Sequence, residues 1–407
     1  MFRFGLRKST ATAAIESAGW LGAEWSSTRV RAILLAQGRS RSVQLDPPHD
    51  DAPLALTLDK RDPDTGYAAL ARCRLLPHAF CGNFLAQVGD PQEWRGERQA
   101  FSPDSAIRHL AGKLWPRLHR ESDRCGLALP PYLQGAKVRL FHEALQDARW
   151  AVCGSISAPL ALAGHRAKAV GLGSRGQDSA VLIVDADAHA LSLSLVAIGK
   201  HETRQVATVA LPKVSTRIWT ERLIDSISDR CIRVSRRDPR DSAQAEQDLF
   251  LQLEPSLDRM RSGQPFALTI RSDHWYQDLS VAAEDVAAWM LPLQRAAVEG
   301  VQSFLLDAAI ATPLQAIWLT ESAGRLPGLA AALYRLCPER AKVILLPAGA
   351  AADATAALVP RWLSGRLHRM HIDAVLPHDQ PLPSPELPPA IAGSKPPRAV
   401  LPTPRKD

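Results

Sequence analysis

Gly22-Ala-Glu-Trp-Ser-Ser-Thr-Arg-Val-Arg-Ala-Ile-Leu-Leu35 is a stretch whose design is repeated much later, in Ile183-Val-Asp-Ala-Asp-Ala-His-Ala-Leu-Ser-Leu-Ser-Leu-Val196. In each stretch an acidic residue, Glu24 or Asp185, precedes a short turn, and the turn precedes a strand. The second strand alternates leucine with serine and the first alternates more loosely, as expected for strands with one buried face. A repeat with so wide a spacing predicts two similar lobes rather than a solenoid.

Bulk composition predicts a cytoplasmic globular protein. A chain of 407 residues with 46% hydrophobic and 22% charged residues can bury a large core in two or three lobes. No apolar run approaches the roughly 20 residues that cross a bilayer, so no transmembrane segment is expected. The N-terminus lacks the apolar core of a secretory signal; it faintly resembles an organelle transit peptide, against which Glu16 counts. Six scattered cysteines without a C-x-x-C pair indicate reduced thiols, not a metal site or disulfide framework.

The basic residues do not favour a nucleic-acid partner. The net charge is only +7, and the densest basic stretch lies at 230–240. Asp229, Asp238 and Asp241 interrupt this stretch, and no aromatic residues are interleaved for stacking on bases. We therefore interpret it as a solvated helix end with local ion pairs rather than a nucleic-acid surface.

Composition divides the chain into four parts. Residues 1–18 are expected to form a flexible arm or a short docking helix, 19–170 the first lobe and 177–370 the second. The glycine-rich stretch 171–176 precedes a strand rather than joining strand to helix, so a hinge is favoured over a phosphate loop. Ten of the last 31 residues are proline, so 376–407 is predicted to be a disordered tail.

Strands and helices alternate along both lobes, which predicts an α/β architecture. Strands are expected around both repeated stretches and at 127–132, 266–270, 316–320 and 342–346. Helices are expected at 67–74, 78–88, 105–124 with a kink at Pro116, 136–151, 214–237, 243–260 with a break at Pro255, 281–306, 328–336 and 350–363.

Three further segments, in the expected order, resemble motifs of the nucleotide-binding domain of the heat-shock protein 70 chaperones. They are Leu127-Ala-Leu-Pro-Pro-Tyr-Leu-Gln-Gly-Ala-Lys-Val138, Ser157-Ala-Pro-Leu-Ala-Leu-Ala163 and Leu319-Thr-Glu-Ser-Ala-Gly-Arg-Leu-Pro-Gly-Leu329. The last resembles the adenosine motif of that family and is the most specific. The resemblance covers roughly residues 20–365. It implies a two-lobed, duplicated ribonuclease-H-like α/β fold of the kind shared with actin.

The same resemblance assigns a vestigial nucleotide cleft to this chain. Its positions are Glu24, Ser26, Ser27, Thr28, Asp185, Asp187, His189, Glu321 and Ser322. Most of them depart from the family pattern. Glu24 replaces an aspartate, Ser26 a glycine of the first turn, and Glu321-Ser322 a glycine pair. Asp187, Ala188 and His189 replace the glycines of the second turn, Ser192 replaces its second aspartate, Leu70 the lysine that reaches the transferred phosphate, and Ala158 a glutamate.

These departures predict a pseudo-ATPase with no catalytic residues. Glycines let a phosphate approach the backbone, whereas side chains obstruct it. A carboxylate at Asp187 about 4 Å from a phosphate oxygen would cost roughly 4 kcal/mol at an effective dielectric of about 20. Leucine in place of lysine removes a charge that stabilises the transition state. We therefore expect no cofactor, with ATP or ADP and magnesium as the alternative.

Several residues allow two interpretations. Glu24, Asp185 and Asp187 could hold Mg²⁺, but a polar strand end bonded to nearby backbone is favoured. His189 could act as a base, but a structural or exposed role is favoured. Ser27 and Thr28 could bind an anion or simply form a turn. His368 and His371 have no catalytic partner nearby in sequence, so exposed, solvated positions are expected for both.

Three functional hypotheses follow. The first is a non-catalytic scaffold or regulatory binding module with an unidentified protein partner, since the chain is too short for the substrate-binding domain of a full chaperone. The second is a weak Mg-ATP-dependent ATPase with an altered cleft. The third is an actin-like assembly platform. The segment 385–388 in the proline-rich tail could dock into a partner's aromatic groove, although inert disorder is favoured.

Overall fold

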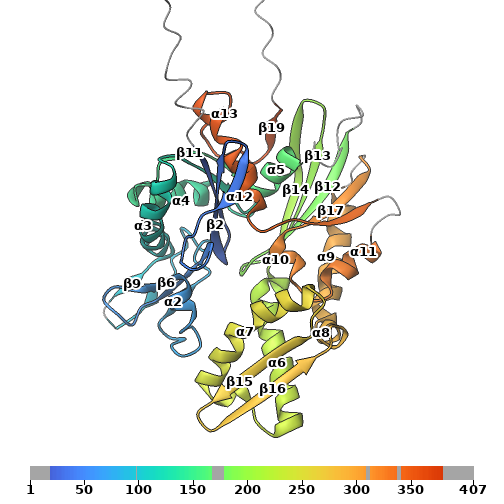
Figure 1. Ribbon diagram of the computed structural model, residues 1–407. Helices are drawn as coiled ribbons and strands as arrows, with labels where there is room; N and C mark the ends of the chain where they lie inside the picture. The colour runs from blue at the N-terminus through green and yellow to red at the C-terminus, as the bar shows by residue number, and fades with distance from the viewer. Residues whose placement is uncertain (1–18, 98, 167–177, 309–311, 337–340, 379–407) are drawn as a thin grey trace, which may run out of the picture.

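Two sheets organise the molecule, one in each lobe (Figure 1). The computed structural model describes residues 19–97, 99–166, 178–308, 312–336 and 341–378. The first sheet has the order β11-β10-β1-β2-β3, with β4 paired to β2. Its strands are β1 (Trp20–Trp25), β2 (Arg29–Ala36), β3 (Arg39–Ser42), β4 (Asp51–Pro53), β10 (Cys125–Leu129) and β11 (Val152–Ser157).

The second sheet has the order β18-β17-β12-β13-β14-β19. Its strands are β12 (Ser179–Ala186), β13 (Leu191–Ile198), β14 (Glu202–Leu211), β17 (Leu314–Leu319), β18 (Lys342–Leu345) and β19 (Val375–Pro377). In both sheets the first strand pairs with an antiparallel second strand on one side and with a parallel strand on the other. The mixed α/β class predicted from the sequence is confirmed, and the two sheets share their core strand order and directions.

Helices and small strands complete both lobes. The helices are α2 (Gly66–Leu70), α3 (Pro103–Glu121), α4 (Ala136–Asp147), α5 (Ala158–Arg166), α6 (Thr216–Ser235), α7 (Ala243–Arg261), α8 (Ala283–Trp289), α9 (Leu291–Asp307), α10 (Glu321–Gly324), α11 (Leu329–Leu336), α12 (Ala350–Ala356) and α13 (Val359–Leu363). Short 3₁₀ turns lie at Pro212–Val214 and Pro239–Asp241. The remaining strands are β5 (Ala55–Thr57), β6 (Asp64–Thr65), β7 (Phe80–Gly82), β8 (Trp94–Arg95), β9 (Ala100–Phe101), β15 (Phe266–Ser272) and β16 (Trp275–Val281).

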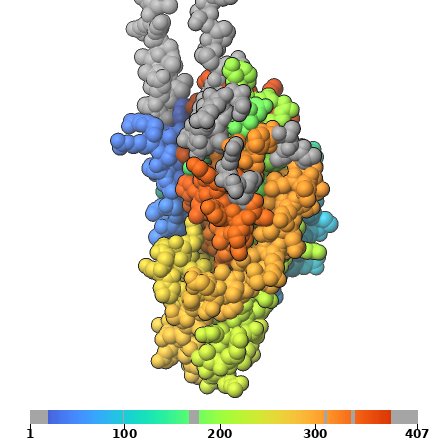
Figure 2. Space-filling model, turned by 90° about the vertical axis from the view of Figure 1, so that its right-hand side faces the viewer, coloured from blue at the N-terminus to red at the C-terminus, as the bar shows by residue number. Residues whose placement is uncertain are grey.

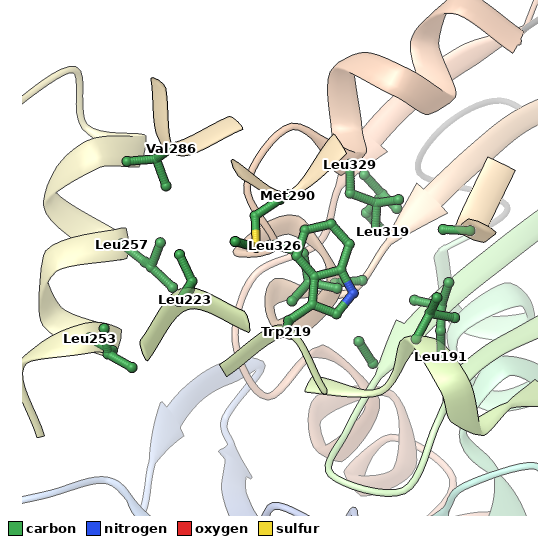
Figure 3. Close-up of a cluster of buried hydrophobic side chains, with 14 of the residues drawn as sticks. Leu191, Trp219, Leu223, Leu253, Leu257, Val286, Met290, Leu319, Leu326 and Leu329 are labelled. Atoms are coloured by element: carbon green, nitrogen blue, oxygen red, sulfur yellow. The ribbon is translucent and has the colours of Figure 1, made fainter. Parts of the chain in front are cut away.

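Each lobe has its own apolar core. In the second lobe, helix α9 packs against β13 and β14 of the sheet. Helices α6 to α8 and the β15–β16 hairpin extend away from the sheet, and Figure 2 shows this part as a continuous surface below the sheet-bearing part. Figure 3 shows how Trp219 of α6 joins these parts, with Leu191 on one side and Met290 and Leu326 near its ring. Trp219 is only 1% exposed, so this ring is a central element of the second core.

A third apolar cluster lies between the sheets and contains α5 and α12. Its members come from both lobes and include Ile156 from β11 and Ile183 from β12. On β1, Gly22 is required because a Cβ there would lie 2.0 Å from the carbonyl oxygen of Ala352 in α12. The absence of a side chain lets the helix backbone touch the strand backbone, so the two lobes share one tightly packed layer.

The structure corrects several expected elements. Residues 78–88 form β7 and turns rather than a helix, and α7 passes through Pro255 without a break. The helix expected at 281–306 is two helices, α8 and α9, and strand β16 was missed. The predicted arm 1–18, the hinge 171–176 and most of the proline-rich tail lie outside the described residues. Within the described part of the chain, no helix has the length and apolarity needed to cross a bilayer.

Candidate functional site

The turns of the two repeated hairpins contact each other directly. The backbone N–H of Ser27, in the β1–β2 turn, donates to Oδ2 of Asp187, in the β12–β13 turn, at 2.9 Å. In the opposite direction, the N–H of Ala188 donates to Oγ1 of Thr28 at 2.8 Å. These bonds join residues about 160 positions apart, and the first of them is fully buried. The sequence-predicted pairing of the hairpins is therefore present as physical contact.

The Asp187 carboxylate has hydrogen-bond donors on both oxygens. Oδ2 accepts from Ser27 and from the Tyr132 hydroxyl, while Oδ1 accepts from the N–H groups of His189 at 2.9 Å and Ala190 at 3.0 Å. The side chain is buried, with the residue 2% exposed. Burial raises the pKa of Asp187, and the hydrogen bonds from Tyr132 and the backbone oppose that rise.

Tyr132 links Asp187 to the first lobe. Its hydroxyl lies 2.8 Å from Oγ of Ser27 and donates to Asp187. Burial and the neighbouring Asp187 carboxylate raise the pKa of Tyr132 well above its usual value, so the phenol remains a hydrogen-bond donor. Its ring also contacts the imidazole of His189, with centroids 4.7 Å apart. Burial lowers the pKa of His189, which favours the neutral ring.

Two further carboxyl groups lie near the ends of β1 and β12. Burial raises the pKa of Glu24 to about 7, helped by Asp185 and Glu321 and opposed by Arg31. Burial and Asp187 raise the pKa of Asp185 to about 6, and Oδ1 of Asp185 accepts a hydrogen bond from Thr320 at 2.6 Å. A carboxyl group that titrates near neutral pH has the property required of a general acid or base.

A charged cluster crosses the rest of the cleft. Arg29 donates to Asp51 of its own lobe and to Glu254 of α7, both at 2.7 Å. Arg31 donates to Glu321 of α10 at 2.8 Å. Burial raises the pKa of Glu254, but Arg29 and then Arg325 outweigh it and hold the value at about 2.

Arg325 completes this cluster in the second lobe. It bonds Glu254 and Glu321, and its Nε lies 2.9 Å from Asp258. The Arg31, Glu321 and Arg325 side chains are only 12–14% exposed, so these pairs are poorly screened by solvent. The cluster borders a cavity of about 430 Å³.

The lobes meet again beyond this cavity. The N–H of Arg74 donates to Oε1 of Gln247 in α7 at 2.8 Å, and Nε2 of Gln247 donates to the carbonyl of Leu70 at 3.1 Å. The Arg74 guanidinium also pairs with Glu221 and Glu246. Leu70, predicted to stand in place of a phosphate-binding lysine, thus contributes its backbone to a contact between the lobes.

The structure brings together most of the sequence-predicted site residues. Glu24, Ser27, Thr28, Asp185, Asp187, His189 and Glu321 all contribute to the facing surfaces or their charge network. Ser26 instead stabilises its own turn, because its Oγ donates to the carbonyl of Arg29 at 3.1 Å. Ser322 lies in α10 beside Glu321. In the described ranges, no group of three or more histidine, cysteine or acidic side chains is placed to hold a metal ion.

The residues that complete the network were not predicted from the sequence. Tyr132 lies in a segment that resembles a family motif, but no role was predicted for its hydroxyl. Arg29 and Arg31 alternate along a strand, a spacing that places both side chains on one face. Glu254 and Asp258 are four residues apart on α7 and therefore share a helix face. These spacings were available signals, but which lobe they faced depended on the tertiary fold.

Comparison of the chain with protein-family models found no match. Comparison with curated proteins also found no match.

Proposed function

We propose that the two sheets are halves of a duplicated ribonuclease-H-like fold, similar to that of actin and the heat-shock protein 70 nucleotide-binding domain. Two observations support this proposal. The sheets share their core strand order and directions. Their first hairpins also face each other and touch through Ser27 and Asp187, as the resemblance requires of the two phosphate-binding hairpins.

On this proposal, the cleft is a pseudo-ATPase site in which a protein carboxylate stands where a phosphate would bind. The observation that carries the proposal is the Asp187 carboxylate, which accepts the Ser27 N–H and the Tyr132 hydroxyl. A phosphate needs the same donors, because backbone N–H groups are what such hairpins offer to anions. A bound triphosphate would have to displace a buried, fully hydrogen-bonded carboxylate and then tolerate its charge.

The charged cluster adds a second barrier to nucleotide binding. Three arginines, Arg29, Arg31 and Arg325, face the cavity, but each is already paired with carboxylates of Asp51, Glu254 or Glu321. An anionic ligand would have to break these pairs to gain their positive charge. Leaving either partner buried and unpaired is costly, typically about 3–5 kcal/mol.

The function we propose is that of a non-catalytic scaffold or regulatory binding module with a protein partner. Three sets of protein contacts join the lobes: the hairpin turns, the charged cluster and the Arg74–Gln247 contact. Lobes joined by their own side chains and backbone present one continuous surface to a partner.

Isothermal titration of the purified chain with Mg-ATP tests this proposal. We expect no heat of binding at nucleotide concentrations up to about 1 mM. The Kd would then be weaker than about 1 mM, which corresponds to a binding free energy of roughly −4 kcal/mol. Asp187→Gly, which removes the carboxylate, should be titrated in parallel with Asp241→Gly at an exposed position. Micromolar binding by the unmodified chain would overturn the pseudo-ATPase proposal.

A weak Mg-ATPase is the second candidate, favoured by one observation. The pKa of Glu24 is about 7, so this carboxyl group could accept a proton from water at neutral pH. Glu24→Gln should then abolish a slow, magnesium-dependent release of phosphate. Equal release by Glu24→Gln and the unmodified chain would assign the activity to a contaminant.

A further inference from the structure

A C-terminal segment, residues 371–378, runs across one edge of each sheet (Figure 1). On the first sheet, Ile372 forms a parallel bridge with Ile156 of β11. Its N–H donates to the carbonyl of Ser155 at 3.0 Å, and its carbonyl accepts from the N–H of Ser157 at 2.8 Å. On the second sheet, β19 within this segment pairs antiparallel with the start of β14. We refer to residues 371–378 as the strap.

Side chains anchor the strap on the second sheet. Leu376 is 2% exposed and lies against Gly164 of α5. A Cβ at position 164 would be 2.5 Å from Cδ2 of Leu376, so the glycine leaves the space that this leucine fills. Arg361 also donates from Nη2 to the carbonyl of Pro377 at 2.6 Å. The strap is therefore firmly packed on the side of the second sheet.

On the first sheet, the strap is anchored by a serine between two histidines. Oγ of Ser155 lies 2.9 Å from Nε2 of His142 in α4 and 3.0 Å from Nδ1 of His371. The expectation that His371 is exposed and solvated was wrong, because the pairing of Ile372 with β11 draws the preceding residue against the sheet. His368, three residues earlier, is exposed as expected.

Neutral imidazole completes this arrangement. The Ser155 hydroxyl can donate to one neutral ring nitrogen while the other ring donates to the hydroxyl oxygen. If both histidines were protonated, neither ring nitrogen could accept the hydroxyl proton, and two half-buried cations would flank one oxygen. That state is unfavourable because burial penalises charge and the two charges repel each other.

The charges around the pair do not remove this penalty. Burial lowers the pKa of His142, and burial lowers that of His371 to about 4, with Asp373 opposing the shift and His142 adding to it. Near the start of β11, the positive charges of Arg124 and Arg369 lower the pKa of the neighbouring Cys153, and the negative charge of Asp123 raises it. Asp373 is thus the acidic group that acts on His371.

We propose that the strap is an acid-sensitive link between the two sheets. It stays docked while His371 and His142 are neutral, and it detaches from the first sheet when they are protonated. This role is separate from the cleft and does not depend on whether nucleotide binds there.

The direction of the pH effect follows from the lowered pKa of His371 in the docked strap. His371 takes up a proton less readily in the docked strap than in a free one, so docking is strongest above about pH 6.5 and weakens as the pH falls toward 4. With a pKa of about 4 docked and 6.5 free, the opening equilibrium should increase roughly 20-fold between pH 7 and pH 5.

Hydrogen exchange of the full chain at pH 7 and pH 5, corrected for intrinsic rates, tests the proposal. The amides of Ile372, Ser157 and Gln205 bond across the strap, so their protection should fall roughly 20-fold at the lower pH. Amides within the β12–β13 pair serve as the internal reference. His371→Asn keeps a polar partner for Ser155 without titrating, and it should remove the roughly 20-fold part of the pH response that His371 contributes.

His368→Asn is the matched control, because it removes an exposed histidine close in sequence, and it should respond to pH as the unmodified chain does. Equal protection at both pH values, or an unchanged response in His371→Asn, would overturn the proposal. An NMR titration of the unmodified chain gives an independent check that needs no variant. A His371 imidazole that titrates near pH 6.5 in the folded protein would also overturn it.

Discussion

The two hairpin turns occupy matching places in matching sheets, yet they differ in what they offer. The turn of the first lobe supplies the N–H of Ser27 and the hydroxyl of Thr28, whereas the turn of the second lobe supplies the Asp187 carboxylate and the N–H of Ala188. Turns that both offered donors would need an anion between them. Two hairpins in sheets of the same core strand order can therefore bind each other directly when one turn carries a carboxylate opposite an N–H of the other.

The first strands of the two sheets differ in a related way. Glu24 and Asp185 match in position, so Gly22 on β1 corresponds to Ile183 on β12. The glycine lets α12 touch β1, while the isoleucine packs into the cluster between the sheets. At these two matched positions, α12 is held by backbone contact with β1 in the first lobe, whereas the second lobe contributes side-chain packing.

Removing the Asp187 carboxylate, which joins the two turns, should lower the free energy of unfolding more than any other substitution proposed below. Asp187→Ala leaves the donors on Ser27, Tyr132, His189 and Ala190 without their acceptor, and we expect a loss of about 4 kcal/mol in the free energy of unfolding. Urea denaturation measures it. Ser27→Ala keeps the backbone donor and should lose only about 1 kcal/mol. Equal losses would mean that the carboxylate does not organise the contact.

Adding one methyl group should sharpen the comparison of the first strands. Gly22→Ala places a carbon against the backbone oxygen of Ala352, which cannot move aside as a side chain could. We expect a loss of about 3 kcal/mol, measured by urea denaturation. Ala32→Gly on the neighbouring strand, which removes a methyl group without adding contact, should lose only about 1 kcal/mol. A Gly22→Ala variant as stable as the unmodified chain would contradict the described packing of α12.

The acidic residues before the turns predict a pH dependence. The pKa of Glu24 is raised from an ordinary 4.5 to about 7, so its stabilising neutral form is fully present below about pH 4.5 and is lost as the pH rises through 7. The side chain is half-buried, so solvent screening reduces the effect of the full pKa shift. We expect the free energy of unfolding of Glu24→Gln, relative to that of the unmodified chain, to be about 2 kcal/mol higher at pH 8 than at pH 4.5. Urea denaturation at both pH values measures this gain. Glu97→Gln, at an exposed position, should show no such change.

The charged cluster offers the smallest expected effect. A double-mutant cycle of Arg31→Met and Glu321→Gln should give a coupling free energy of about 1–2 kcal/mol, because this pair is shielded from solvent. The exposed pair Arg95–Glu93 should give less than about 0.5 kcal/mol by the same measurement. A coupling of the same size in both cycles would show that the cleft does not shield its charges.

Strands and helices that depend on local periodicity were predicted correctly from the sequence. Elements set by contacts between distant segments were not. Both repeated hairpins are confirmed, because alternation and turn residues are local signals. The strand expected at 127–132 is present but lies at Cys125–Leu129. The helix expected at 78–88 was wrong, because the packing of the first lobe places Phe80–Gly82 beside β5 as a strand. The break expected at Pro255 was also wrong, since a helix held by tertiary contacts tolerates an internal proline.

For the site, the sequence located the residues better than their partners. Asp187 was predicted to oppose a phosphate by its charge, but its bonds to Ser27 and Tyr132 join three separate parts of the chain. The exposure of His371 was predicted incorrectly for the same reason, because its partner Ser155 lies in a strand more than 200 residues earlier. Such pairings are set by topology, which local patterns do not encode.

The contact of Gly22 with α12 has a mechanical consequence. Two backbones in direct contact can turn against each other, but they cannot be pressed closer together. A rotation about this contact would also move the turn in which Ser27 meets Asp187, because Gly22 and Ser27 lie on the same hairpin.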